Sequence, residues 1–538
     1  MYTPDSVVYL CNVPLEADQK NQLHFSSVSE QTNYFESTVV KELTGFTFVR
    51  RDSAIRCPEN IEDLYNCNYV MYQNSHFTDK WFYAFITELE YLNDAVTAIH
   101  IKTDVFQTWM FEAEILPSFV EREHTNNDTI GANILPEPPS IGPYKYVESH
   151  EILNGPNTDM TIIVAASDEP GNENTADNQG ANYSRVYQGC GFWAFDYNDF
   201  SGVNSFLSQM TESNKIDSVV AIFMIPKVFV GDYTSRDKLS SRSGTRFQTQ
   251  IALTNYTLDG YVPKNNKLYT YPYRFLKLSN NNGVSRTFHY EFFTENPIRF
   301  EIDCDISPSP AMLCYPINYN QAYNGSTLNA DTTYVEGVSF DNLPTCSWRV
   351  DSYRQWIAAN RNKLNASLFG IGFDAIRGLT RTAVNTANSG SVATGAANLA
   401  LGLGNTALNA VESAISLNAQ YSDAESKGND LKGNVSGALL AQNLDVNFKL
   451  FEMCITSEYA KVIDDFFSMY GYTTNEVKVP NIGTRENWNY VKTIDIQITG
   501  AIPNDDMTEL REIYNSGVTI WNNPETFGDY SQNNSIVS

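Results

Sequence analysis

The stretch Lys80–Phe111, KWFYAFITELEYLNDAVTAIHIKTDVFQTWMF, decides the fold class of this chain. It is rich in aromatic and β-branched residues, which favour strands. Its pattern also has a period of two, which places successive side chains on opposite faces of a strand. The clearest alternation sets Tyr83, Phe85, Thr87 and Leu89 against Ala84, Ile86 and Glu88. We therefore expect the whole stretch, including its end DVFQTWMF, to form β-strands.

The same texture continues on both sides of this stretch. The sequence up to about Gly142 has the pattern of β-strands. The prolines clustered in Leu135–Pro143, LPEPPSIGP, are typical of a linker. From Tyr144 to Pro344, short apolar runs such as MTIIVAA and SVVAIFMIPKVFV are separated by clusters of Asn, Gly and Asp. This spacing predicts a second β-rich domain with long loops.

The last part of the chain mixes helices and strands. The apolar residues of DSYRQWIAANRNKL, from Asp351, have helical spacing, as do those of the segment that ends at Gly471. A closing helix is expected from Asn504 to Gly517. In VKTIDIQITG the isoleucines alternate with polar residues, which predicts a half-buried strand. Each of these elements is predicted to turn one face inward. In the helix that ends at Gly471 this face holds Tyr459, Val462, Ile463, Phe466, Phe467 and Tyr470. In the closing helix it holds Leu510, Ile513 and Tyr514, and in the strand it holds Ile494, Ile496 and Ile498.

The chain is strongly acidic, with 36 Lys and Arg against 63 Asp and Glu and a formal net charge of −27. Nucleic-acid-binding proteins cluster cations to neutralise phosphates, and the sequence shows no such cluster. An acidic surface suits a protein past which DNA slides without being held, and it equally suits simple solubility. The eight cysteines form no CxxC pair. We expect them to be buried free thiols in a chain made in a reducing cytoplasm.

Signals of catalysis are weak. The six histidines include no pair at metal-ligand spacing, and the serine nucleophile motif GxSxG does not occur. Three carboxylate pairs have the spacing that a retaining glycosidase needs, although any solvated strand face shows the same alternation. These pairs are Glu88/Glu90, Glu112/Glu114 and Glu121/Glu123. We expect no catalytic, cofactor-binding or metal-binding residue and no cofactor, and a cell-wall glycosidase is the least favoured alternative.

The segment Asn365–Gln442 differs from the rest of the chain. From Thr382 to Val411 it holds 30 residues without a charge. As a helix this run would reach about 45 Å, more than the roughly 30 Å of a bilayer's hydrocarbon core. Its five asparagines make it too polar to span a membrane alone, so copies would have to share their polar groups. The alternative is a buried hairpin of Ala/Gly-rich helices within the fold. The membrane-active residues are predicted to be Phe369, Ile371, Phe373, Ile376, Leu379, Ala396, Leu399, Ala400, Leu401, Leu403, Gly404, Leu408 and Val411.

Three blocks of the sequence resemble one known family. Tyr69–Asn74 with Lys80–His124, Phe466–Thr493 and Gly500–Asn522 resemble the tail knob (distal tail-tube) proteins of phi-29-like short-tailed bacteriophages, the podoviruses. The matching strings, among them WFYAFITELE and VFQTWMFEAEILPSFVEREH, are long and idiosyncratic, so chance is a poor explanation. The resemblance covers both ends of the chain and does not extend to Tyr144–Pro344.

The resemblance implies a hexameric ring in which the N- and C-terminal parts close the β-barrel walls of a tube. The genome would be ejected through the lumen without specific DNA binding, and long apolar loops would plug the distal end and then penetrate the host membrane. It also implies a structural protein of the virion tail, with other tail and collar proteins and the host membrane as partners, and no enzyme activity.

Four parts are then expected along the chain. They are a tube domain at 1–142, a β-rich middle domain at 143–350, a helix leading into an apolar loop at 351–445, and a C-terminal α+β part at 446–538 that packs with the tube domain. The second reading is a host cell-wall receptor-binding (adsorption) protein. In that case the aromatic run Gly191–Phe195, GFWAF, could stack on sugars, although burial in a core is the favoured expectation for it.

Overall fold

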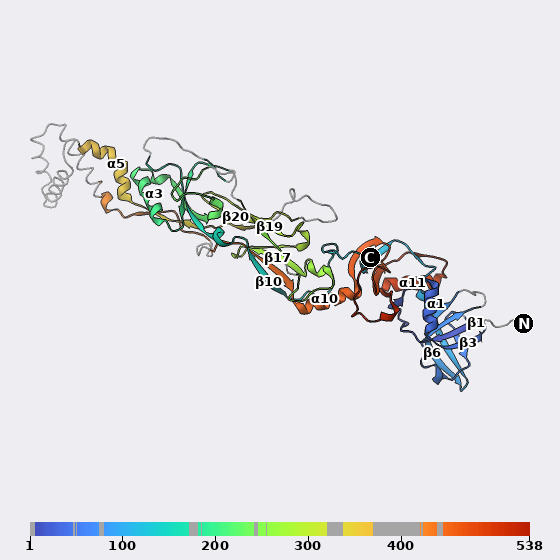
Figure 1. Cartoon of the computed structure of the whole chain (residues 1–538). Helices are drawn as coiled ribbons and strands as arrows, with labels where there is room; N and C mark the ends of the chain where they lie inside the picture. The colour runs from blue at the N-terminus through green and yellow to red at the C-terminus, as the bar shows by residue number, and fades with distance from the viewer. Residues whose placement is uncertain are drawn as a thin grey trace, which may run out of the picture.

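A computed structural model of the chain shows an elongated, mostly β molecule (Figure 1). The N-terminal strands lie at one end with helix α11 (Asn504–Ser516) beside them, and helix α5 (Ser352–Leu368) lies at the other end. The structure describes residues 6–46, 49, 51–74, 80–171, 181–183, 186–240, 246–253, 256–319, 337–368, 420, 423–437 and 445–537.

The N-terminal end is built on a six-stranded antiparallel sheet. Its two faces bury separate apolar clusters, one around Val70 and Ile99 and the other around Phe35 and Tyr83, so the central strands are apolar on both sides. The sheet order is β3 (Val39–Phe46), β1 (Ser6–Cys11), β5 (Tyr69–Gln73), β6 (Phe82–Asn93), β7 (Val96–Thr103) and β4 (Ala54–Cys57), with helix α1 (Val28–Ser37) at β1.

A five-stranded sheet joins the two ends of the chain. Two strands from the first 123 residues are interleaved in it with three strands from the last 70, so neither end could form this sheet alone. Its order is β2 (Asn21–Leu23), β29 (Val518–Trp521), β27 (Trp488–Ile494), β9 (Ser118–Glu123) and β26 (Tyr472–Lys478). A two-stranded pair, β8 (Glu114–Ile115) with β28 (Ile498–Thr499), lies in the same part of the chain.

The middle of the molecule contains three four-stranded antiparallel sheets over one large apolar core. The first is β10 (Tyr144–Glu151), β25 (Lys449–Ile455), β17 (Arg274–Ser279) and β18 (Ser285–Phe288). The second is β14 (Gly191–Asp196), β11 (Met160–Ala166), β15 (Val219–Pro226) and β22 (Thr345–Cys346). The third is β16 (Arg246–Ile251), β19 (Ile298–Cys304), β20 (Met312–Pro316) and β21 (Val338–Phe340).

Shorter elements complete the described part of the chain. They are the pairs β12 (Ala181–Tyr183) with β13 (Val186–Gln188) and β23 (Trp348–Val350) with β24 (Asp430–Lys432), and the helices α2 (Val105–Trp109), α3 (Phe200–Glu212), α4 (Lys227–Val230) and α10 (Ser457–Tyr470). Short 3-10 turns include η3 (Ile216–Ser218), η4 (Asn266–Tyr269) and η5 (Tyr290–Phe292).

The strands predicted in the deciding stretch are confirmed as β6 and β7, but its end is not a strand. DVFQTWMF contains helix α2 instead. The helix starts there because the Asp104 carboxylate accepts hydrogen bonds from the backbone N–H groups of Phe106 and Gln107, each at 3.1 Å. This is the N-cap contact that starts a helix. Burial raises the pKa of Asp104 to about 6.

The strand predicted over VKTIDIQITG is only partly correct. Asp495 has a φ of +53°, which breaks the strand after Ile494. As a consequence Ile496 and Ile498 point inward as predicted, whereas Ile494 is 55% exposed and its neighbour Thr493 is buried. The prediction that Ile494 lies on the inward face is therefore wrong.

The predicted helices are confirmed as α5, α10 and α11. Helix α10 ends at Gly471 and α11 at Gly517, as expected. The predicted inward face of α11 is correct, but the face of α10 is narrower than expected, because Val462 is 67% exposed and Tyr459 is also exposed. All eight cysteines are free, and seven are buried, with Cys346 half-buried. The division at 142/143, 350/351 and 445/446 stays a prediction.

Candidate functional site

The predicted membrane-active residues lie outside the described residues, so the structure does not test whether they come together. They are Phe369, Ile371, Phe373, Ile376, Leu379, Ala396, Leu399, Ala400, Leu401, Leu403, Gly404, Leu408 and Val411. Within the described ranges, no helix combines the length and the apolar character needed to cross a bilayer.

Among the described residues, the chain leaves the middle of the molecule after β23 and returns to it at β24, and we call this place the neck. The neck is the antiparallel pair β23–β24, in which Trp348 lies opposite Lys432. Beyond it, Thr345 Oγ1 donates to the carbonyl of Asn434 at 2.9 Å. Gly433 has a φ of +67°, and a Cβ placed on it would lie 2.5 Å from the Trp348 ring, so only glycine fits there. The neck thus closes the base of the excursion, residues 351–429, which contains the charge-free run Thr382–Val411.

Helix α5 leaves the neck and is fixed to its surroundings at its first turn. The Gln355 side chain donates to Asp217 at 3.0 Å, and Arg354 lies 3.7 Å from Glu212 at the end of α3. Figure 1 places α3 and α5 at the end of the molecule opposite the N-terminal sheet. The excursion therefore starts from the end farthest from the N-terminal strands.

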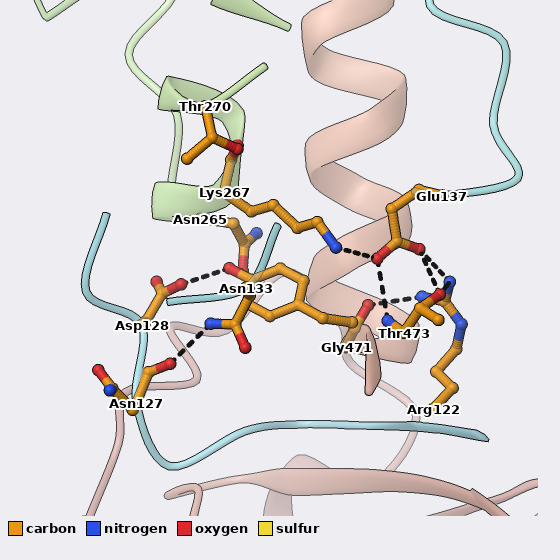
Figure 2. A network of polar contacts seen from close by, with 11 residues as sticks. Arg122, Asn127, Asp128, Asn133, Glu137, Asn265, Lys267, Thr270, Gly471 and Thr473 are labelled. Atoms are coloured by element: carbon orange, nitrogen blue, oxygen red, sulfur yellow. Dashed lines mark hydrogen bonds and ion pairs between the residues drawn. The ribbon is translucent and has the colours of Figure 1, made fainter. Parts of the chain in front are cut away.

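A buried ion cluster, which we call the joint, connects the five-stranded sheet to the middle domain (Figure 2). Its centre is the Glu137 carboxylate, fully buried although it belongs to the Pro-rich segment 135–143. This carboxylate accepts from Arg122 of β9 and from Lys267 of η4. It also accepts from the backbone N–H of Thr473 at 2.9 Å and from the Thr473 hydroxyl at 3.0 Å. The predicted linker is therefore a fixed connection that holds three parts of the chain together.

The cations of the joint are themselves enclosed. Arg122 donates to the carbonyl of Gly471 at 2.7 Å and lies 4.8 Å from the centre of the Phe466 ring. Lys267 is buried near the rings of Phe467 and Tyr472, and burial lowers the pKa of its amine. Two buried cations thus depend on one carboxylate. Loss of Glu137 would therefore leave the positive charges of both Arg122 and Lys267 uncompensated.

A second layer of hydrogen bonds surrounds the joint. Asp464 of α10 accepts from the backbone N–H and the side chain of Asn265, at 3.0 and 2.8 Å, and from the Tyr261 hydroxyl at 2.7 Å. Asp128 accepts from the Tyr472 hydroxyl at 2.5 Å and from the backbone of η4 at 3.2 Å. The loop before η4 is therefore attached both to α10 and to the segment that follows β9.

Gly471 allows these elements to approach one another. It ends α10 with a φ of +63°, and a Cβ placed on it would lie 2.1 Å from the carbonyl oxygen of Glu123. A side chain at this position would therefore push α10 away from β9. The joint was missed in the sequence because its members are up to 351 residues apart. The only local signal was an acidic residue within a proline-rich run.

Three apolar side chains on neighbouring strands of the five-stranded sheet are open to solvent. Phe119 of β9 lies opposite Val477 of β26 on one side and opposite Ile494 of β27 on the other. Their exposed fractions are 37%, 71% and 55%, so three neighbouring apolar side chains face outward. Strand β26 is at the edge of the sheet. We call these three residues the apolar row. Open edges with apolar side chains are places where a further chain can pair.

Comparison with known proteins now decides the family. A family model described as "Bacillus phage phi29, Tail knob protein gp9, C-terminal domain" matches residues 235–535, more than half of the chain. The chain belongs to this tail knob family. A second model, "Caudoviral major tail protein N-terminus", matches residues 4–114.

Full-length relatives agree with this assignment. Tail knob protein gp9 of Bacillus phage phi29 is 28% identical and covers 99% of this chain and 98% of its own length, and that of Bacillus phage B103 is 27% identical over 98% and 97%. The tail knob protein gp12 of bacteriophage C1 has the same fold, with a TM-score of 0.63 over 99% of this chain and 100% of that one, at 17% identity. The match therefore extends through Tyr144–Pro344, where the sequence resemblance had shown none.

Membership in the tail knob family makes this chain a structural component of the phage tail in the virion, which associates with other tail proteins. It is not an enzyme. One of the three carboxylate pairs lies on a solvated strand face. Glu88 and Glu90 are exposed on β6, as a solvated strand face predicts. Glu123, however, is buried and holds Lys478 and Asn481, so the expectation of a solvated face at Glu121/Glu123 is wrong.

The aromatic run Gly191–Phe195 of this tail knob protein forms β14 and is buried, as favoured. Phe192 and Phe195 are inaccessible and Trp193 is nearly so. The sugar-stacking surface considered for a receptor-binding protein is therefore not present at this run.

Proposed function

We propose that six copies of this chain form a ring whose lumen conducts the genome during ejection, and that the excursion beyond the neck plugs the distal exit and then enters the host membrane. The position of the neck carries this proposal: the excursion starts at the end of an elongated molecule, far from the N-terminal sheet. A segment placed there can reach across an exit without disturbing the walls. The net charge of −27 suits a lumen that does not hold phosphate.

The apolar row supports the ring. An acidic copy repels another acidic copy, so contact is favoured where the surface is uncharged and apolar. Phe119, Val477 and Ile494 form such a surface beside the open edge of β26. In a ring each copy uses one surface toward the next copy and a different surface toward the previous one. We assign the apolar row to one of these two surfaces.

Phe119→Asp is expected to weaken ring formation at least tenfold, because it places a charge in an apolar contact between acidic partners. Mass photometry across protein concentrations measures the effect, and association of the unmodified chain should strengthen as salt screens the charges. Tyr187→Asp, at a 68% exposed aromatic residue outside the row, is the matched control and leaves assembly unchanged. Monomers of the unmodified chain at every salt concentration, or tight binding of duplex DNA at physiological salt, would contradict the conduit.

A buried carboxylate, that of Glu291 of η5, lies at the contact between the middle of the molecule and the segment after β9. Its side chain is 2% exposed, lies against Gly131, and has the backbone N–H of Tyr271 at 3.3 Å and Nδ1 of His289 at 3.6 Å. No lysine or arginine among the described residues forms an ion pair with it. Burial raises the pKa of Glu291 to about 7, and burial also lowers the pKa of His289.

Glu291→Gln is expected to stabilise the chain at pH 8 by about 3 kcal/mol and to change nothing at pH 4. The pKa of Glu291 is higher in the folded than in the unfolded chain, so the folded state prefers the neutral form. Its contribution to stability is complete below about pH 4.5 and is lost as the pH rises through about 7. Urea denaturation at both pH values measures the difference. Glu88→Gln, on an exposed strand face, is the control, and an equal gain from both substitutions would disprove the assignment.

A further inference from the structure

Three potential metal ligands meet on two neighbouring strands of the middle domain. Glu148 and His150 belong to β10, and Glu452 lies opposite Glu148 on β25. One ligand atom from each of the three side chains lies within 4.8 Å of the other two, and His150 Nε2 is 2.9 Å from Glu452 Oε1. No such site was expected from the sequence, because His150 and Glu452 are 302 residues apart.

Hydrogen bonds to one oxygen of the Glu452 carboxylate orient its other oxygen. Its Oε2 accepts from Arg274 Nη2 at 2.9 Å and from the Tyr290 hydroxyl at 3.0 Å. These two donors fix the carboxylate and leave Oε1 directed toward His150. Hydrogen-bonded carboxylates of this kind are usual around bound metals, because the second oxygen's partners orient the first.

The charge of the cluster also favours a cation. The carboxylates of Glu148 and Glu452 contribute two negative charges, and Arg274 contributes one positive charge. A net negative charge therefore remains after the Arg274–Glu452 ion pair is counted. Glu452 is buried, His150 half-buried and Glu148 exposed, so the cluster opens to solvent on the Glu148 side.

We propose that Glu148, His150 and Glu452 bind a divalent transition ion of the zinc class. One imidazole nitrogen and two carboxylate oxygens are a zinc ligand set, whereas calcium and magnesium prefer oxygen alone. Ligand atoms around tetrahedral zinc lie about 3.3 Å apart, so a small closure of the exposed Glu148 side chain completes three positions and leaves the fourth to water. The ion would link β10, which follows the joint, to β25, which precedes α10.

The full chain, stripped with EDTA and titrated with zinc chloride by calorimetry, is the test. We expect one zinc ion per chain at micromolar concentration and a higher melting temperature, because a ligand that binds only the folded state stabilises it. Calcium chloride gives neither effect. Cobalt(II) should give the visible absorption of a four-coordinate site.

Substitutions assign the ion to this cluster. His150→Ala and Glu148→Gln are each expected to weaken zinc binding at least tenfold without lowering the melting temperature of the metal-free chain by more than a few degrees. Glu151→Gln, next to His150 but paired with Lys449 at 3.5 Å, is the matched control and leaves binding unchanged. Absence of zinc binding to the stripped chain, or binding that survives His150→Ala, shows that the cluster is an ion-pair network only and overturns the proposal.

Discussion

Glu137→Ala lowers the free energy of unfolding by about 3–5 kcal/mol, the effect expected when a buried ion pair loses one partner. The reason is that Arg122 and Lys267 stay buried without their shared carboxylate, and Thr473 loses an acceptor for both its backbone N–H and its hydroxyl. Urea denaturation of the full chain measures the loss.

Two comparisons make this prediction sharp. Glu121→Ala removes a half-exposed partner of Lys492 on the same strand as Arg122 and is expected to cost less than about 1 kcal/mol. Adding Lys267→Met to Glu137→Ala should recover part of the loss, because it removes one of the stranded charges. Equal losses from Glu137→Ala and Glu121→Ala would show that the joint does not hold the domains.

We expect the intact chain to make liposomes leaky, as the proposed function requires, and Leu401→Asp combined with Leu408→Asp to abolish this dye leakage. Each aspartate at the centre of a membrane helix costs about 2.5–3.5 kcal/mol, and the two together reduce insertion by more than about a thousandfold. Leu431→Asp, in β24 and outside the charge-free run, is the matched control and leaves leakage intact.

Replacing residues 369–419 with a short Gly/Ser linker should abolish leakage yet leave the proposed ring assembled, because β23 and β24 still close the neck. Sealed liposomes under every lipid and pH condition, together with collapse of the ring on deletion, would show that the segment is part of the core.

Sequence patterns predicted the elements whose signal is local. The alternation in Lys80–Phe111 gave β6 and β7, and the positions of Gly471 and Gly517 gave the ends of α10 and α11. Two of these predictions were wrong for local reasons. The N-cap contact of Asp104 starts helix α2 where a strand was predicted, and the positive φ of Asp495 places Ile494 at the surface.

The joint could not be predicted in the same way. Its contacts depend on how distant segments meet, and a glutamate among prolines has the composition of a solvated linker until Arg122 and Lys267 are placed beside it. The apolar row depended on the same long-range pairing, because Phe119 meets Val477 and Ile494 only when both ends of the chain share one sheet.

The neck also affects how freely the segment between β23 and β24 can change in length. Since β23 and β24 hold the two ends of the excursion one strand spacing apart, we expect the number of residues between α5 and residue 420 to have little effect on the rest of the molecule. Doubling the length of a closed loop costs only about 0.6 kcal/mol of chain entropy. We therefore expect this segment to tolerate exchange or lengthening without a compensating change elsewhere. For the same reason, the interval between Leu368 and Gln420 is the place in this chain where we expect a foreign peptide to be tolerated.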